Sequence, residues 1–223
     1  MILAIDTTGT FGSIALCEQG EVREEVLIHA PDGYGSILFP RIDALLARHG
    51  VAVREIACFA AASGPGSFTG VRVGLTTAKG LAEAARKPIV AVSNLKALAF
   101  FGHTALRATV LDARRGQVYG ALYDDSLALR GEEVVQAFPQ WLRSLPPREI
   151  EFVAQDFSPF AQAIAGGPLA ESRVTEAPRA LAGAIGCIAT GEFLNGRAQD
   201  PAAADANYVR RSDAELLWKD NLR

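Results

Sequence analysis

Short apolar runs separated by polar turns open the chain. Residues 2–5 are apolar and stop at Asp6, a second apolar run covers residues 11–17, and a third candidate covers residues 21–28. Runs of this length bounded by polar and glycine residues are typical of strands, and short loops between them favour antiparallel pairing. The pattern predicts a three-stranded antiparallel meander.

The spacing of the apolar residues becomes helical after this meander. Ser36 is placed to cap a helix and Gly50 to end it, and Pro40 is tolerated because it lies near the first turn. We therefore predict a helix over residues 36–49. Its apolar positions are Ile37, Leu38, Ile42, Leu45 and Leu46.

A strand, a helix and a second strand are predicted next. The pattern places a buried strand at residues 56–62, a glycine-rich loop at 63–67, a long helix at 68–86 and a strand at 88–92. Two strands joined by a crossover helix lie parallel in one sheet. The first lobe is therefore predicted to combine an antiparallel meander with a parallel crossover unit.

The second half of the chain repeats this order. Asp6 lies nine residues before Ala15 and Asp112 lies nine residues before Ala121, and each Asp ends an apolar strand and opens a hairpin. This self-similarity favours a duplication over chance. We predict two similar α/β lobes with mixed sheets, residues 1–105 and 106–223. The second lobe would hold strands at 108–111, 117–123 and 151–154 and helices at 138–144, 159–164 and 179–194.

Charge and cysteine content bear on the cellular setting. The formal net charge is −3, so no overall positive field would hold the chain on a phosphate backbone. If the chain acts on nucleic acid, we expect it to do so through a partner protein. Cys17, Cys58 and Cys187 each lie in an apolar run, which indicates buried thiols in a reducing compartment. With no signal-peptide pattern or membrane-length apolar stretch, we expect a cytoplasmic protein.

The loop 63–67 joins a buried strand to the start of a helix. Free backbone N–H groups and the positive end of the helix dipole favour an anion at such a place. The loop lacks the lysine and the glycine spacing of a P-loop. The same residues fit a tight turn with Ser67 as the helix cap, and we favour the turn over the anion site.

Small residues form a stripe along the helix predicted at 68–86. Gly70, Gly74, Ala78 and Ala82 recur every four residues, so this ridge would allow another helix closer than the usual ~8–10 Å. Each interior glycine costs ~1 kcal/mol relative to alanine, which close packing must offset. The residues alone leave open whether a foreign helix or the chain's own sheet and helix covers this stripe.

Asp6, Thr7 and Thr8 resemble the first phosphate loop of the actin, Hsp70 and sugar-kinase superfamily. That loop usually carries glycine where Thr8 stands, and a β-branched side chain there would crowd a phosphate. Asp112 is a weaker match for the second phosphate loop, because two arginines occupy the turn that follows it. We favour a hairpin-closing role for both aspartates.

Other catalytic chemistry has little support in the residue pattern. His29, His49 and His103 include no pair four residues apart and no carboxylate at metal-ligand spacing, which argues against a zinc or iron site. No serine lies in a nucleophile elbow. We therefore assign no catalytic residue and no metal site.

Four segments together resemble the TsaB (YeaZ) family. The most specific is the run from Ala62 to Gly74, which contains Gly-Pro-Gly-Ser-Phe-Thr-Gly. The others are Ile2-Leu3-Ala4-Ile5-Asp6-Thr7-Thr8, Leu111-Asp112-Ala113-Arg114-Arg115-Gly116-Gln117-Val118-Tyr119 and Tyr208-Val209-Arg210-Arg211.

The resemblance implies an actin-like ATPase (ribonuclease H-like) fold and a non-catalytic subunit that stabilises TsaD. TsaD transfers a threonylcarbamoyl group to the adenosine beside the anticodon of certain tRNAs, and TsaE, an ATPase, joins the assembly. The resemblance implies no cofactor for the chain alone and ATP or ADP only at an interface shared with a partner. A homodimer is a second way of pairing, tRNA contact runs only through the complex, and no membrane is involved.

The resemblance also implies that helices 36–49 and 68–86 form the pairing surface, which assigns the small-residue stripe to a partner. Two departures from the family stand out. Tyr34-Gly35-Ser36 replaces a common His-Ser/Ala-Glu element, and Ala154-Gln155-Asp156 replaces a Gly-Asp-Gly turn. The expected interface residues are Ile37, Leu38, Ile42, Leu45, Phe68, Gly70, Val71, Gly74, Leu75 and Ala78.

Two other functions remain open at this point. One is an ATP-binding phosphotransferase of the same superfamily, with Asp6 and Asp112 holding a metal nucleotide. The other is a peptidase that acts on TsaD. Binding of Mg-ATP to the lone chain would favour the first, and a defined cleavage of TsaD would favour the second.

Overall fold

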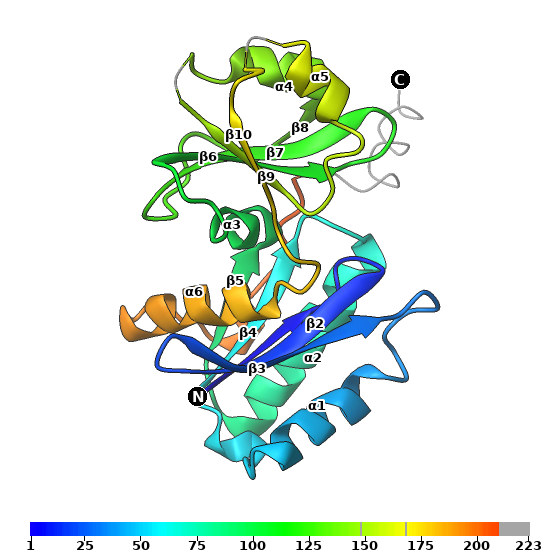
Figure 1. Cartoon of the computed structure of the whole chain (residues 1–223). Coiled ribbons are helices and arrows are strands. Elements are labelled where there is room, and N and C mark those ends of the chain that lie inside the picture. The colour runs from blue at the N-terminus through cyan, green and yellow to red at the C-terminus, as the bar shows by residue number, and fades with distance from the viewer. Residues whose placement is uncertain (148, 168, 210–223) are drawn as a thin grey trace, which may run out of the picture.

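The computed structural model describes residues 1–147, 149–167 and 169–209, and it contains two five-stranded mixed sheets (Figure 1). Arg210 and Arg211 of the C-terminal motif lie outside the described residues. In spatial order the first sheet consists of β3 (Glu21–His29), β2 (Phe11–Glu18), β1 (Ile2–Asp6), β4 (Cys58–Gly64) and β5 (Ile89–Ser93).

The pairing of the first sheet confirms the predicted meander and crossover. β1 pairs antiparallel with β2, and β2 pairs antiparallel with β3. β4 is parallel to β1, and β5 is parallel to β4. The helix α2 (Phe68–Ala85) makes the crossover between β4 and β5.

The second sheet repeats the first strand for strand. In spatial order it consists of β10 (Arg173–Glu176), β9 (Glu151–Ala154), β6 (Leu106–Asp112), β7 (Gln117–Asp124) and β8 (Val134–Ala137). β6, β7 and β8 form an antiparallel meander, and β9 and β10 run parallel to β6. Asp6 and Asp112 therefore end equivalent strands, and the topology confirms two similar lobes with mixed sheets.

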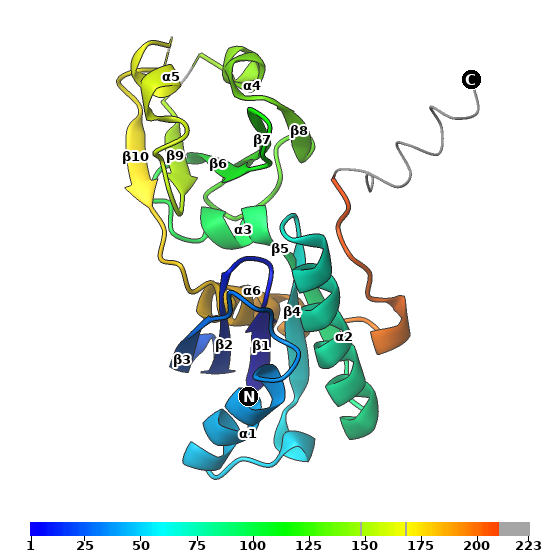
Figure 2. The same ribbon diagram turned by 90° about the vertical axis from the view of Figure 1, so that its right-hand side faces the viewer.

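Helices cover both faces of the first sheet. α1 (Leu38–Arg48) and α2 pack on one face, against the side chains of Leu3 and Ile5. α6 (Ala182–Leu194) packs on the other face, against Ala4 and Cys17, and α3 (Asn94–Ala99) lies between the two sheets (Figure 2). Because both faces are covered, β1 is buried along its whole length, which explains its continuous apolar run.

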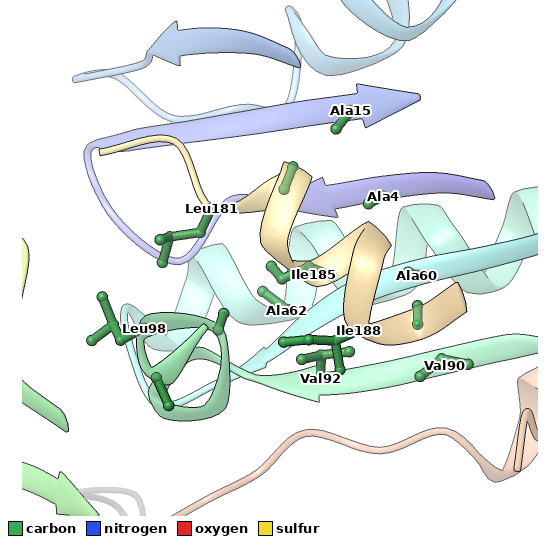
Figure 3. Close-up of a cluster of buried hydrophobic side chains, with 14 of the residues drawn as sticks. Ala4, Ala15, Ala60, Ala62, Val90, Val92, Leu98, Leu181, Ile185 and Ile188 are labelled. Carbon is green, nitrogen blue, oxygen red and sulfur yellow. The ribbon is translucent and has the colours of Figure 1, made fainter. Parts of the chain in front are cut away.

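Small side chains bring α6 close to the first sheet. Figure 3 shows Ala4 and Ala60 on the strands beneath Ile185 and Ile188 of α6. All four side chains are less than one-tenth exposed. Alanines on the strands leave room for the larger aliphatic groups of the helix, as close packing of a core requires.

The core of the second lobe is aromatic. α4 (Phe138–Ser144) and α5 (Ala161–Ala165) pack on the sheet through Phe138, Trp141 and neighbouring side chains. Gly120 on β7 makes this possible, because a Cβ atom there would lie 2.5 Å from the Trp141 ring. Two short 3-10 helices, Val53–Glu55 and Pro201–Ala203, complete the described elements.

One α-helix and two strands were not predicted from the sequence, nor were the two 3-10 helices. α3 follows β5 directly, capped by the Ser93 hydroxyl, which accepts a hydrogen bond of 3.1 Å from the Leu95 N–H. β8 and β10 are four-residue strands at the sheet edges, too short to show a period. The predicted Ser36 cap is wrong, because α1 has Ile37 at its N-cap and Leu38 N–H donates to the Tyr34 carbonyl.

The end of the chain returns to the first lobe. The sequence placed α6 in the second lobe, residues 106–223, but its apolar residues pack on the first sheet. Gln199 then pairs with Ile89 at the edge strand β5. The first lobe therefore contains residues from both ends of the chain. Within the described residues, no helix has the length and apolar character needed to cross a membrane.

Candidate functional site

A cleft of about 610 Å³ lies between the lobes, where β1 and β6 end. The loop after β1, the loop between β4 and α2, and the turn after β6 all reach it. Asp6, Thr8, Gly66 and Asn94 line it from the first lobe, and Asp112, Arg114, Tyr119 and Asp156 line it from the second.

Asp6 is buried, and its carboxylate accepts hydrogen bonds from Thr8. One oxygen accepts hydrogen bonds from the Thr8 N–H at 2.9 Å and from the Thr8 hydroxyl at 2.7 Å. Burial raises the pKa of Asp6 above its ordinary value, although the hydrogen bonds from Thr8 oppose this shift. The two bonds from Thr8 tie the carboxylate to its own hairpin.

Thr8 joins the phosphate-loop candidate to the glycine-rich loop. Its hydroxyl accepts a hydrogen bond of 2.7 Å from the Asn94 amide, and its carbonyl accepts one of 2.7 Å from the Ser67 N–H. A Cβ atom on Gly66 would lie 2.7 Å from the Thr8 Cβ. The two loops are thus in van der Waals contact, and no space remains between them for a further group.

Several backbone N–H groups of the glycine-rich loop donate hydrogen bonds within the protein. Gly64 N–H donates to the Asn94 side chain at 3.0 Å, Ser67 N–H donates to Thr8, and Gly70 N–H donates to the Ser67 hydroxyl at 3.3 Å. Ser67 caps α2 as predicted. These bonds favour the tight turn over the anion site, because the N–H groups of Ser67 and Gly70 at the start of α2 already have acceptors in the protein.

Asp112 closes its hairpin in the same way as Asp6. Its carboxylate accepts a hydrogen bond of 2.7 Å from the N–H of Arg114, two residues on, as Asp6 does from Thr8. Arg114 and Arg115 have φ angles of 66° and 55°, an unusual left-handed conformation for side chains of this size. Both aspartates thus have the hairpin-closing geometry that the sequence favoured.

The small-residue stripe on α2 faces the interior of the chain's own lobe. A Cβ atom on Gly70 would lie 2.0 Å from the Thr7 carbonyl oxygen, and one on Gly74 would lie 2.4 Å from the Thr7 hydroxyl. Ala78 and Ala82 have no solvent exposure. The interpretation of this stripe as a surface for a foreign helix is therefore corrected, because the first lobe covers it with the loop after β1.

Most of the other expected interface residues are also interior. Leu38, Ile42, Leu45, Val71 and Leu75 are all less than one-tenth exposed, and Ile37 is partly buried. Phe68 alone in that set is well exposed, at 44%. The periodicity thus identified the inner faces of α1 and α2, which the first lobe buries.

The outer faces carry two exposed aromatic groups, Phe68, which the sequence analysis named, and Phe39, which it missed. Phe39 on α1 is 55% exposed, more than the other exposed aromatic side chains of the described residues, Phe68, Phe100 and Tyr208. Phe68, at the start of α2, lies beneath the Arg72 guanidinium, 3.7 Å from the ring centre, and beside the Tyr208 ring. The sequence does carry a signal for Phe39, because this apolar residue falls outside the helical stripe that contains Ile42 and Leu45.

Each of the three histidines contacts a different neighbouring residue. His29 stacks on Phe11 with 4.5 Å between ring centres, His49 lies 2.8 Å from a Glu24 oxygen, and His103 lies 3.2 Å from a Glu151 oxygen. In the part of the chain that the structure describes, no three His, Cys, Asp or Glu side chains are gathered as a metal-ligand set.

Comparison with known proteins gives the family. The family model of TsaD, tRNA N6-adenosine threonylcarbamoyltransferase, matches residues 30–179. The tRNA threonylcarbamoyladenosine biosynthesis protein TsaB of Bacillus subtilis is 32% identical over 97% of this chain and 97% of its own length. The chain belongs to the TsaB (YeaZ) family.

Other TsaB proteins and structures agree with this assignment. TsaB of Escherichia coli is 37% identical over 59% of each chain. The structure of YeaZ from Pseudomonas aeruginosa superposes with a TM-score of 0.80 at 25% identity and covers 93% of this chain and 98% of its own. A TsaD of Novosphingobium aromaticivorans matches only 30% of this chain and 19% of its own length. The two mixed sheets in one TsaB chain thus form the actin-like, ribonuclease H-like fold that the resemblance implied.

Proposed function

We propose that this TsaB-family chain is a non-catalytic subunit of the tRNA threonylcarbamoyladenosine biosynthesis system, where it stabilises a TsaD-type transferase. The observation that carries this proposal is the similarity to B. subtilis TsaB along 97% of both chains. That relative is named for this biosynthesis, and the match leaves no large part of either chain unaccounted for.

The geometry of the cleft supports a subunit without chemistry of its own. Thr8, in the loop after β1, packs directly against Gly66 in the loop before α2. The buried carboxylate of Asp6 accepts a hydrogen bond from the hydroxyl of the same threonine. A phosphotransferase would use Asp6 and Asp112 to hold a metal nucleotide, but each carboxylate accepts hydrogen bonds from its own hairpin, which gives the kinase alternative no support. The peptidase alternative gains no support from the P. aeruginosa structure described as similar to "peptidase YEAZ", because a likeness at 24% identity bears on the fold alone.

The outer faces of α1 and α2 are the surface we propose for TsaD. Both helices lie on one face of the first sheet, opposite α6 (Figure 2). Phe39 and Phe68 are exposed there, and exposed aromatics are typical anchors of protein interfaces. Residues 30–179, which match the TsaD model, include both helices, so a TsaD-type partner would present an equivalent pair and the contact would be pseudo-symmetric.

The same surface would serve a homodimer, which we propose as the competing state. A TsaE-type ATPase would join the assembly, tRNA would be contacted through the complex, and ATP or ADP would bind only at a shared interface. The net charge of −3 fits an indirect relation to tRNA, because phosphate contact is driven by positive charge.

Reconstitution tests the proposal. We expect tRNA modification with TsaD and TsaE to require this chain, and the chain alone to show neither modification nor micromolar binding of Mg-ATP in calorimetry. Full modification in its absence would contradict the proposal. Tight Mg-ATP binding by the lone chain would favour the phosphotransferase, and a defined cleavage of TsaD in mass spectrometry would favour the peptidase.

A further inference from the structure

Cys17 and Cys187 come from opposite ends of the chain and lie together in the first lobe. Cys17, on β2, has no solvent exposure, and Cys187, on α6, is partly exposed. The Cys17 sulfur lies against the turn of α6 that carries Cys187, between Gly183 and Gly186. Both are free cysteines in this structure.

Glycines on α6 make room for the Cys17 side chain. The Cys17 Sγ atom lies 3.9 Å from the Gly183 carbonyl oxygen. A Cβ atom on Gly186 would lie 2.3 Å from the same sulfur, so any larger residue there would displace it. α6 crosses directly over this part of the sheet, with Ala4 and Ala15 beneath it (Figure 3). The buried thiol is therefore held against the turn of the helix that carries Cys187.

The two thiols differ in their acidity. The hydrogen bond from Cys17 lowers the pKa of Cys187, against the opposing effects of burial and of the carboxylates of Glu25 and Glu21. The same hydrogen bond, together with burial, raises the pKa of Cys17. Exposure separates the two thiols further: Cys187 is partly exposed and can be reached by a solute, whereas Cys17 is fully buried beside it.

A partly exposed thiol beside a buried second thiol is the arrangement of a peroxide-sensitive cysteine with its resolving cysteine. We propose that Cys17 and Cys187 form such a pair and close to an intramolecular disulfide between β2 and α6. Cys58 takes no part, because it is buried on β4 and burial raises its pKa to about 12.

The reaction balances with hydrogen peroxide as the oxidant. The Cys187 thiolate attacks one peroxide oxygen and becomes a sulfenic acid, while the other oxygen leaves as hydroxide and takes up a proton to form water. The Cys17 sulfur then attacks the sulfenic sulfur, loses its proton, and expels a second water. The two thiols are oxidised by two electrons in total, and one peroxide is reduced to two waters.

The disulfide would fasten the returning segment of the chain to the first sheet. α6 follows β10 of the second lobe and precedes the pairing of Gln199 with Ile89. A covalent link from β2 to α6 closes a loop that contains the whole second lobe. Oxidation is therefore expected to raise the temperature of thermal unfolding, because such a link restricts the unfolded chain.

The test treats the full folded chain with hydrogen peroxide and then counts thiols after denaturation. Wild type is expected to fall from its three thiols to one, and Cys58→Ser from two to none. Peptide mapping without reductant should show one linked pair containing Cys17 and Cys187, and reductant should restore all thiols. Cys187→Ser, on the partly exposed side, should keep both remaining thiols under the same treatment.

Three results would overturn the proposal. Wild type could retain all of its thiols, the linked pair could contain Cys58 or join two molecules, or Cys187 could advance to a sulfinic acid without a cross-link. Peroxide treatment in urea controls for chance pairing, because the linked pair should lose its preference for Cys17 and Cys187 once the fold is lost. Equal yields of that pair in folded and unfolded protein would also count against it.

Discussion

The hydroxyl group of Thr7 donates a hydrogen bond of 2.7 Å to the backbone carbonyl of Gly70. This bond places the loop after β1 directly on the first turns of α2. Because neither Gly70 nor Gly74 has a side chain, the loop and the helix approach to the distance of backbone contact. The glycines of the small-residue stripe thus serve the fold of the first lobe.

Gly74→Leu is accordingly predicted to destabilise the isolated chain. A Cβ atom at this position meets the Thr7 hydroxyl at 2.4 Å and the Ile5 side chain at 3.6 Å, so a leucine forces the helix away from the sheet. We expect a loss of about 2–4 kcal/mol in the free energy of unfolding, measured by urea denaturation.

Gly80→Ala is the matched control on the same helix. Gly80 is exposed, and a Cβ atom there meets no atom within 4 Å. This variant should gain up to ~1 kcal/mol from helix propensity. Equal stability of Gly74→Leu and wild type would show that the loop after β1 does not pack tightly on the stripe.

Phe39→Gln is predicted to weaken the pairing with TsaD and leave the fold intact. The ring is 55% exposed on the outer face of α1, so its removal costs the monomer little core packing. As an aromatic anchor of the proposed interface, its loss should raise the dissociation constant about tenfold or more in calorimetry.

Leu194→Gln gives the control for this experiment. Leu194 is 76% exposed but lies at the end of α6, on the opposite face of the first sheet. TsaD affinity should stay at the wild-type value in this variant. Similar losses from both substitutions would argue against a specific surface on α1 and α2.

Asp6→Asn is predicted to remove a fall in stability with rising pH. Burial makes the folded-state pKa of Asp6 higher than that of the unfolded chain, so the folded state favours the protonated acid. The free energy of unfolding therefore declines as pH rises through the folded-state pKa, and ionised Asp6 costs stability above it. Asparagine keeps the oxygen that accepts from Thr8, so at neutral pH the variant should be as stable as wild type or more so.

Thr8→Val tests the same contact from the other side. Valine keeps the shape but removes the hydroxyl that donates to Asp6 and accepts from Asn94. Two buried polar groups lose a partner, and we expect a cost of about 1–3 kcal/mol. If Asp6→Asn destabilised the chain at neutral pH while Thr8→Val did not, the carboxylate would have a role other than closing the hairpin.

The sequence predicted those parts of the molecule that depend on local pattern. β1 is buried on both faces, so its apolar run was readable, and the Ser67 cap and the repeated Asp hairpins followed from residue type. The spacing of Gly70 and Gly74 showed which residues share a face of α2, but spacing carries no information about what covers that face. The contacts of Asn94 with Gly64 and Thr8, and of Cys17 with α6, join residues far apart in the chain, and no local pattern marks them.

Asn207 is predicted to hold the C-terminal segment against both lobes. Its amide donates to a Glu133 oxygen at 2.6 Å, and the other Glu133 oxygen accepts from Ser93 of the first lobe and Tyr123 of the second. The backbone N–H of Asn207 donates to the Ser63 carbonyl at 2.7 Å. One partly buried carboxylate thus joins the two sheets and the returning chain.

Asn207→Ala removes the side-chain donor and leaves the backbone bond to Ser63 in place. Without the amide, one Glu133 oxygen loses its donor, and local opening of residues 199–209 should become about tenfold more frequent. Hydrogen exchange of this segment measures the change. Asp205→Ala is the control, since Asp205 is exposed and its side chain accepts only from the neighbouring Ala206 N–H among the hydrogen bonds described. If both variants exchanged alike, the backbone bonds of Asn207 and Gln199 would suffice to hold the segment, and Glu133 would join the lobes through Ser93 and Tyr123 alone.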